Sequence, residues 1–169
     1  MYPETTIRDY LLDADGSSRD ITFTPVKRER MIAFLRLLKT RHRPESLRDG
    51  EGNDILPLLS REDWPGMFAP ESGHLHGCWS SPTELLPRLQ TFVDWDGGPS
   101  GDHCLEVSYF PQDVDAASFS VSAFRQLVED WRTTLEASDY FVRYENASWD
   151  LYDPAGLGVF YTHLRQPLP

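Results

Sequence analysis

The sequence predicts an α+β domain, in which a mainly antiparallel β-sheet packs against two main helices at about residues 25–41 and 121–137. Apolar residues recur at helical spacing in these two stretches. Before and after the second of these helices lie stretches that alternate between apolar and polar residues or are rich in β-branched and aromatic residues. The 169 residues, 40% hydrophobic and 12% aromatic, can bury one sizeable core. We therefore expect a single domain spanning residues 1–169.

The first helix is predicted to begin at Thr24-Pro25, because Thr can accept from free N–H groups and Pro at the next position loses no hydrogen bond. It should end near Arg41, because Pro44 pushes Arg43 out of the helical region. Its apolar stripe consists of Met31, Phe34, Leu35 and Leu38.

Residues 44–82 are rich in Pro, Gly, Ser and Asp, which predicts a long, largely irregular segment. Ser81-Pro82-Thr83-Glu84 has the pattern of a capping box, in which Ser81 and Glu84 satisfy free N–H groups of a following helix. Pro87 argues against a long helix there. A short helix that breaks into a strand near residues 91–95 fits equally well.

The second half of the chain alternates between strand and helix patterns. Residues 104–110 alternate as a strand, with Leu105, Val107 and Tyr109 on one face. The clearest helix follows, with an apolar stripe formed by Val121, Phe124, Val128, Trp131 and Leu135. Residues 140–144, 149–152 and 157–164 are rich in β-formers and are separated by turn sequences at 145–148 and 153–156.

The charge distribution indicates the sign of a partner. Residues 1–60 hold 10 basic and 10 acidic side chains, whereas residues 61–169 hold 6 basic and 17 acidic ones, so the second part carries the whole net charge of −11. Clustered Lys and Arg on the first helix could meet phosphate, but a chain of this net charge is repelled from polyanions. We expect a basic protein partner, and neither nucleic acid nor a membrane.

The composition indicates a cytoplasmic bacterial protein. No apolar run is long enough to span a membrane, and the first ten residues do not resemble a secretion signal. The 14 Arg against 2 Lys indicate a GC-rich genome. Cys78 and Cys104 are expected as free thiols in a reducing compartment, although sequence alone leaves their disulfide state open.

Catalytic signatures are few. The chain has neither a Gly-x-Ser-x-Gly elbow nor a phosphate-binding glycine loop followed by Lys-Ser/Thr, and we expect no cofactor. One group has metal-ligand chemistry, because alternate residues of an extended segment point to one side. Its candidate ligands are His74, His76, Cys78 and His103. Their spacing matches no standard zinc signature, so a metal-dependent enzyme is the alternative hypothesis.

The favoured hypothesis is an immunity or antitoxin-type protein that neutralises a basic partner through an acidic, aromatic surface. The predicted contact residues are Asp94, Trp95, Asp96, Asp102, Glu106, Asp113 and Asp115, with Trp149, Asp150 and Asp153 as a second patch. A further alternative is a self-associating assembly subunit, with a homodimer formed through the apolar face of the first helix. In that case Leu35 or Leu38 would be exposed in a monomer.

Overall fold

Seven antiparallel strands form one sheet in the computed structural model, which describes residues 2–97, 103–145, 147, 149 and 158–163. The strand order is β2-β3-β4-β5-β1-β6-β7. In chain order the strands are β1 (Arg19–Thr24), β2 (Arg43–Asp49), β3 (Gly73–Ser80), β4 (Arg88–Trp95), β5 (Cys104–Tyr109), β6 (Asp139–Tyr144) and β7 (Val159–Thr162). The predicted α+β class with an antiparallel sheet is confirmed.

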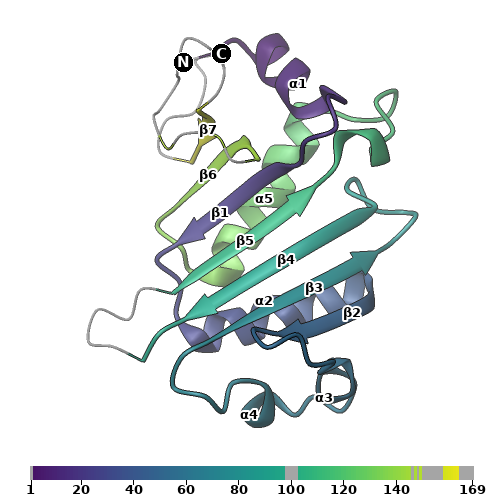
Figure 1. Cartoon of the computed structure of the whole chain (residues 1–169). Helices are drawn as coiled ribbons and strands as arrows, with labels where there is room; N and C mark the ends of the chain where they lie inside the picture. The colour runs from purple at the N-terminus through teal and green to yellow at the C-terminus, as the bar shows by residue number, and fades with distance from the viewer. Residues whose placement is uncertain (1, 98–102, 146, 148, 150–157, 164–169) are drawn as a thin grey trace.

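Two long helices cover the same face of the sheet, as Figure 1 shows: α2 (Arg28–Arg41) behind the β2 side and α5 (Val121–Leu135) behind the β1 side. They meet where the rings of Phe34 and Trp131 pack edge to face, with centroids 5.8 Å apart. The shorter helices α1 (Glu4–Leu12), α3 (Leu56–Ser60) and α4 (Trp64–Met67) lie at the two ends of the sheet. The core therefore forms between one sheet face and the helix layer.

The helix α5 matches its prediction closely. Ser120 caps it by accepting a hydrogen bond from the backbone N–H of Ala123, at 3.0 Å. Glu136 ends it in the left-handed conformation at φ 51°. All five residues of the predicted apolar stripe are buried.

The helix α2 begins three residues later than predicted. Thr24 cannot cap it because Thr24 belongs to β1, where it pairs with Asp139 of β6. The apolar stripe of α2 faces the sheet, and Leu35 and Leu38 are completely buried within a single chain. The assembly-subunit hypothesis required one of them to be exposed in a monomer, and neither is, so this stripe offers no free surface for self-association.

The prediction of a largely irregular segment at 44–82 was wrong, because β2, α3, α4 and β3 all lie in this range or overlap its start. Glycine and histidine hide the alternation of β3, in which Leu75, Gly77 and Trp79 face the core. A Cβ atom at Gly77 would lie 2.8 Å from both the Trp79 Nε1 and the Thr91 Oγ1 atoms. Glycine therefore serves close packing here, not a turn.

The capping box at Ser81 does not start a helix. The backbone N–H of Ser81 donates to the carbonyl of Pro87 instead, which closes a turn between β3 and β4. Residues 91–95 belong to the eight-residue strand β4, so the predicted strand is confirmed, whereas residues 81–87 form turns and bends and not the short helix that was expected before it. The strand predicted at 140–144 is confirmed as β6, and β7 lies inside the predicted 157–164.

The strand predicted at 149–152 and the turn at 153–156 lie outside the described residues, apart from Trp149. None of the helices in the described part of the chain is long and apolar enough to cross a membrane.

Candidate functional site

The two faces of the sheet differ in what covers them. Among the residues that the structure describes, none forms a helix over the face opposite α2 and α5, as Figure 1 shows. Residues paired directly across antiparallel strands point to the same face. The register thus assigns one set of side chains to the face without helices, which we call the open face: Asp20, Thr22, Arg48, His74, His76, Cys78, Gln90, Phe92, Asp94, Cys104, Glu106, Ser108, Phe141 and Arg143. Of these, Asp20, Thr22 and Ser108 at its centre are buried.

A polar network occupies the centre of the open face, across β5, β1 and β6. Asp20 accepts hydrogen bonds from the hydroxyls of Ser18, at 2.9 Å, and Ser108, at 2.8 Å. The Thr22 hydroxyl donates to Glu106 at 2.7 Å. The Arg143 guanidinium lies between the two acids, with its Nη2 atom 3.7 Å from Asp20 and 3.6 Å from Glu106. These contacts fix the positions of three charged side chains.

The environment of Glu106 disfavours its charge. Burial raises the pKa of this carboxyl above its usual range, and the charge of Asp20 raises it further, while the Thr22 hydroxyl and Arg143 act in the opposite direction. Arg143 therefore holds together two carboxylates that would otherwise repel each other.

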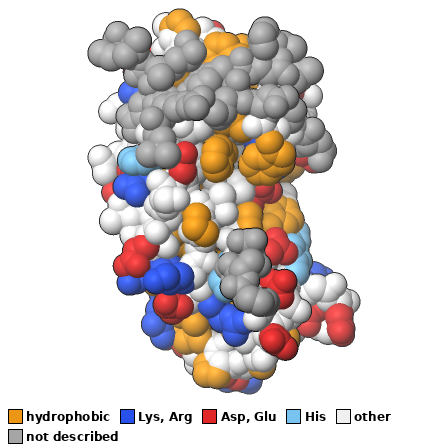
Figure 2. Space-filling model, turned by 90° about the vertical axis from the view of Figure 1, so that its left-hand side faces the viewer, with side chains coloured by type: hydrophobic (Ala, Val, Ile, Leu, Met, Phe, Trp, Pro, Cys, Tyr) orange, Lys and Arg blue, Asp and Glu red, His pale blue; other side chains and the backbone are white. Residues whose placement is uncertain are grey.

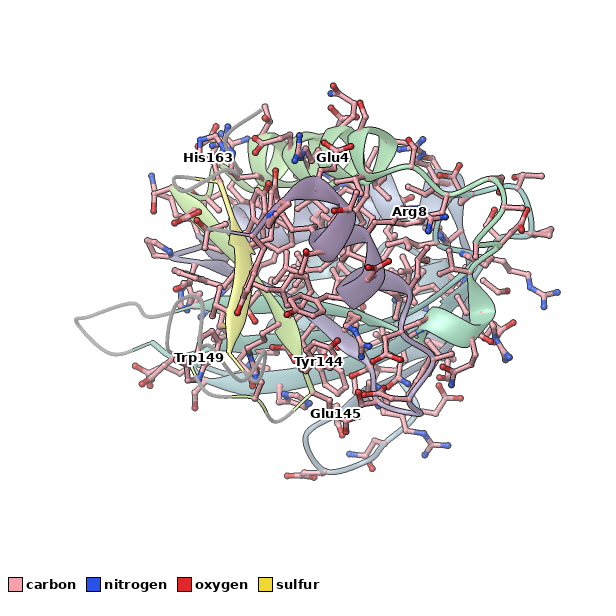
Figure 3. The ribbon with its side chains drawn as sticks, turned by 90° about the horizontal axis from the view of Figure 1, so that it is seen from above. Glu4, Arg8, Tyr144, Glu145, Trp149 and His163 are labelled. Atoms are coloured by element: carbon pink, nitrogen blue, oxygen red, sulfur yellow. The ribbon has the colours of Figure 1, made fainter. Side chains whose placement is uncertain are left out.

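Trp149 lies at one end of this network and is 57% exposed, the highest exposure of any large hydrophobic side chain in the part of the chain that the structure describes. Its ring stacks on the Arg143 guanidinium, with the Cζ atom 4.3 Å from the ring centroid. It also meets the ring of Phe141 edge to face, at 6.1 Å. Figure 3 shows Trp149 on the side of the sheet away from α5, whereas His163 lies on the α5 side.

Aromatic and histidine side chains extend the open face across β3 and β4. The His76 and Phe92 rings stack with centroids 4.6 Å apart, and His76 is hydrogen-bonded to Gln90 at 3.1 Å. His74 contacts the carboxylate of Asp94 at 2.7 Å. Figure 2, in which the left-hand side of Figure 1 faces the viewer, shows hydrophobic side chains beside His, acidic and basic ones on that side of the molecule. The surface thus mixes aromatic anchors with paired charges.

A hollow of about 280 Å³ lies at the far end of the open face, where β3 and β5 end and β4 begins. Cys78, Gln90 and Ser108 contribute to its lining, and Arg88 and Asp113 are charged residues among the others. The open face is therefore not flat.

Three of the four candidate metal ligands share a side of β3, but the four do not converge. His74, His76 and Cys78 alternate on the open face, as the extended segment predicted. His74 is engaged by Asp94 and His76 by Gln90, while the His103 Nδ1 atom accepts from the backbone N–H of Asp96 at 3.2 Å. Among the described residues, no group of three or more His, Cys, Asp or Glu side chains is placed to hold a metal ion.

The predicted acidic patch separates into two regions. Asp94 and Asp96 lie at the end of β4 beside the start of β5, whereas Asp113 and Asp115 follow the other end of β5, about 17 Å away at the usual rise of a strand. Glu106 lies between them. Asp102, Asp150 and Asp153 lie outside the described residues.

The Trp95 side chain is buried, contrary to the prediction that it anchors a partner. Its side chain is only 4% exposed, packs on Phe68 with centroids 4.8 Å apart, and donates its indole N–H to the carbonyl of Pro70. The segment that covers it comes from about 25 residues earlier in the chain, which local sequence patterns do not reveal.

The sequence interpretation missed the other half of the network, namely Asp20, Thr22 and Arg143, and the ring of Phe141 that meets Trp149. Alternation carried a usable signal in 19–24, because β1 places Asp20, Thr22 and Thr24 at every second position. The signal in 139–144 is weaker, because the apolar Phe141 stands between Asp139 and Arg143. Their pairing across more than 100 residues has no such local signal.

The two cysteines are free and lie two strands apart. Burial raises the pKa of the Cys104 thiol to about 11, and the carboxylates of Glu106 and Asp94 add to this effect. Cys104 is therefore a protonated, poorly nucleophilic thiol at neutral pH.

No protein-family model matches the chain, and no curated protein matches its sequence. Among solved structures, the chain is similar to the Pseudomonas aeruginosa T6SS protein PA0821, with a TM-score of 0.43 and 18% sequence identity. The match covers 82% of this chain and 46% of that one, so this chain spans less than half the length of that protein.

Proposed function

We propose that this protein is a protein-binding module of the immunity or antitoxin type, which neutralises a basic protein partner by covering it with the open face. The observation that carries this proposal is the exposed ring of Trp149, held in place over Arg143. The proposed site of action is the cytoplasm.

Tryptophan and arginine are the residues most often found as binding hot spots, because they bury large areas in defined orientations. Here the tryptophan has partners within its own chain: Arg143 contacts one face of its ring, and Asp20 and Glu106 contact Arg143. A ring fixed in this way loses little conformational entropy when a partner covers it.

The net charge of the chain supports the proposal that the partner is basic. The chain carries a net charge of −11, and Asp94 stands exposed at the edge of the open face. A protein of this charge accelerates the encounter with a basic partner, and salt screens the attraction. The aromatic contacts then determine how slowly the complex dissociates.

The proposal is tested by affinity capture from native lysate at low and high salt, with bound proteins identified by mass spectrometry. The Trp149→Ala variant should retain less than a tenth of the captured partner. Arg36→Ala is the matched control, since Arg36 also stacks on a tryptophan, Trp64, but from the exposed side of α2. A basic protein that is captured equally by wild type and Trp149→Ala would contradict the proposal.

A further inference from the structure

A second concave site lies at the end of the sheet, away from Trp149. It is a pocket of about 260 Å³ between the start of β3, the loop after β2, and the helices α3 and α4. Its apolar floor is formed by Ile55, Leu58, Met67, Leu75 and Trp95. This volume is sufficient for one long side chain, not for a large cofactor.

The packing around Trp95 keeps this floor in place. The indole N–H donates to Pro70 at 3.0 Å, and Phe68 packs against the ring. A Cβ atom at Gly73 would overlap the indole ring, so a residue without a side chain is required where β3 begins. The pocket is therefore formed before any ligand arrives.

Acidic side chains line the mouth of the pocket. Asp49 and Glu51 contribute from the loop after β2, and His74, which is paired with Asp94, joins the pocket to the open face. Asp49 is held by hydrogen bonds from Asn53, which keep the pKa of its carboxyl below the usual range, so it is charged at neutral pH. Two guanidinium groups lie near the pocket and have partners of their own. The Arg28 Cζ atom is 6.0 Å from the centroid of the Trp95 ring, and Arg28 donates to the carbonyls of Phe68 and Glu71, while Arg48 donates to the carbonyl of Gly52 in the loop after β2.

We propose that this pocket binds one lysine or arginine side chain of the partner, with its aliphatic stem on the apolar floor and its cationic end between Asp49 and Glu51. This inference rests on the proposed function for the source of the side chain. An apolar floor with a carboxylate mouth matches the two parts of a basic side chain, whose stem packs on apolar surface while its charge stays at the rim. The partner would then contact two points, this pocket and Trp149.

The test requires no partner. The ¹⁵N-labelled full chain is titrated with N-acetyl-arginine amide and N-acetyl-lysine amide, and with N-acetyl-norleucine amide as a neutral probe with a similar stem. The indole N–H of Trp95 and the amide of Gly73 report on the pocket. We expect saturable shifts of both signals with at least one basic probe, with a Kd on the order of 10 mM or below, and at least fivefold weaker binding of norleucine amide.

Glu51→Gln should weaken binding of the basic probe roughly threefold, the size of an exposed ion-pair contribution. Glu29→Gln removes an exposed carboxylate from α2 and should leave the titration unchanged. Equal binding of norleucine and basic probes, or the absence of saturable shifts at Trp95, would overturn the pocket proposal. Neither result affects the Trp149 capture experiment, and a failed capture leaves the titration unaffected, so the two failures are distinguishable.

Discussion

The two faces of this sheet contain similar residue types in opposite arrangements. On the covered face, Trp131 is completely buried, and Phe34 packs edge to face against it. On the open face, Trp149 is more than half exposed and lies over Arg143. One tryptophan belongs to the core, whereas the other is held at the surface by charged side chains.

The difference shows what each face contributes. Burial of aromatic and aliphatic side chains under α2 and α5 supplies the stabilising free energy of the fold. The network of Asp20, Glu106 and Arg143 adds little net stability, since desolvation of charges offsets their attraction. Its effect is to fix the geometry of a surface.

The largest expected effect is on the covered face. Trp131→Ala should reduce the free energy of unfolding by about 3–5 kcal/mol, because it leaves a cavity between the sheet and the helices. Trp149→Ala should change it by less than about 1 kcal/mol. Urea unfolding of both variants measures the difference, and similar losses would contradict the division of roles between the faces.

Arg143→Leu should reduce the free energy of unfolding by about 3 kcal/mol, because it leaves Asp20 and Glu106 close together without a counter-charge. Adding Glu106→Gln to this variant should restore part of the loss by removing one of the two negative charges. If the double variant is no more stable than Arg143→Leu, repulsion between Asp20 and Glu106 is not the cause of the lost stability.

Two glutamates should respond to pH in opposite directions. Burial raises the pKa of Glu106, so its contribution to stability falls as pH rises from the unfolded value of 4.5 through its folded pKa. For Glu129, burial is outweighed by hydrogen bonds with Arg132 and His163, so its pKa is lowered and its contribution is lost as pH falls below 4.5.

Unfolding of wild type, Glu106→Gln and Glu129→Gln between pH 3 and 7 checks both signs. The stability of wild type relative to Glu106→Gln should decrease above pH 4.5. Its stability relative to Glu129→Gln should decrease below that pH. If both stability differences change in the same direction with pH, the pKa values of the two carboxyl groups are not shifted in opposite directions.

The smallest expected effect on stability is at the edge of the open face. Asp94→Asn should change the free energy of unfolding by less than about 0.5 kcal/mol, since its pair with His74 is exposed. It should nevertheless slow association with a captured basic partner at low salt, as measured by surface plasmon resonance. Asp130→Asn on α5 is the control, and an equal slowing by both would assign the effect to net charge alone.

The covered face was largely predictable from the sequence, because its signals are local. The stripe of α5 and the alternation of β5 follow from residues a few positions apart. The open face was less predictable, since Arg143 and Asp20 are 123 positions apart and only strand pairing brings them together. Trp95 was misassigned for the same reason, because Phe68 and Pro70 cover it from a different segment.

The most direct test of the open face as the binding surface is site-specific photo-crosslinking in cells. A photoreactive amino acid is placed at Arg48 or Asp94 on the open face, and at Gln126 or Thr133 on the exposed side of α5. We predict a crosslinked partner from the open-face positions and none from α5. Crosslinks from α5 alone would contradict the account.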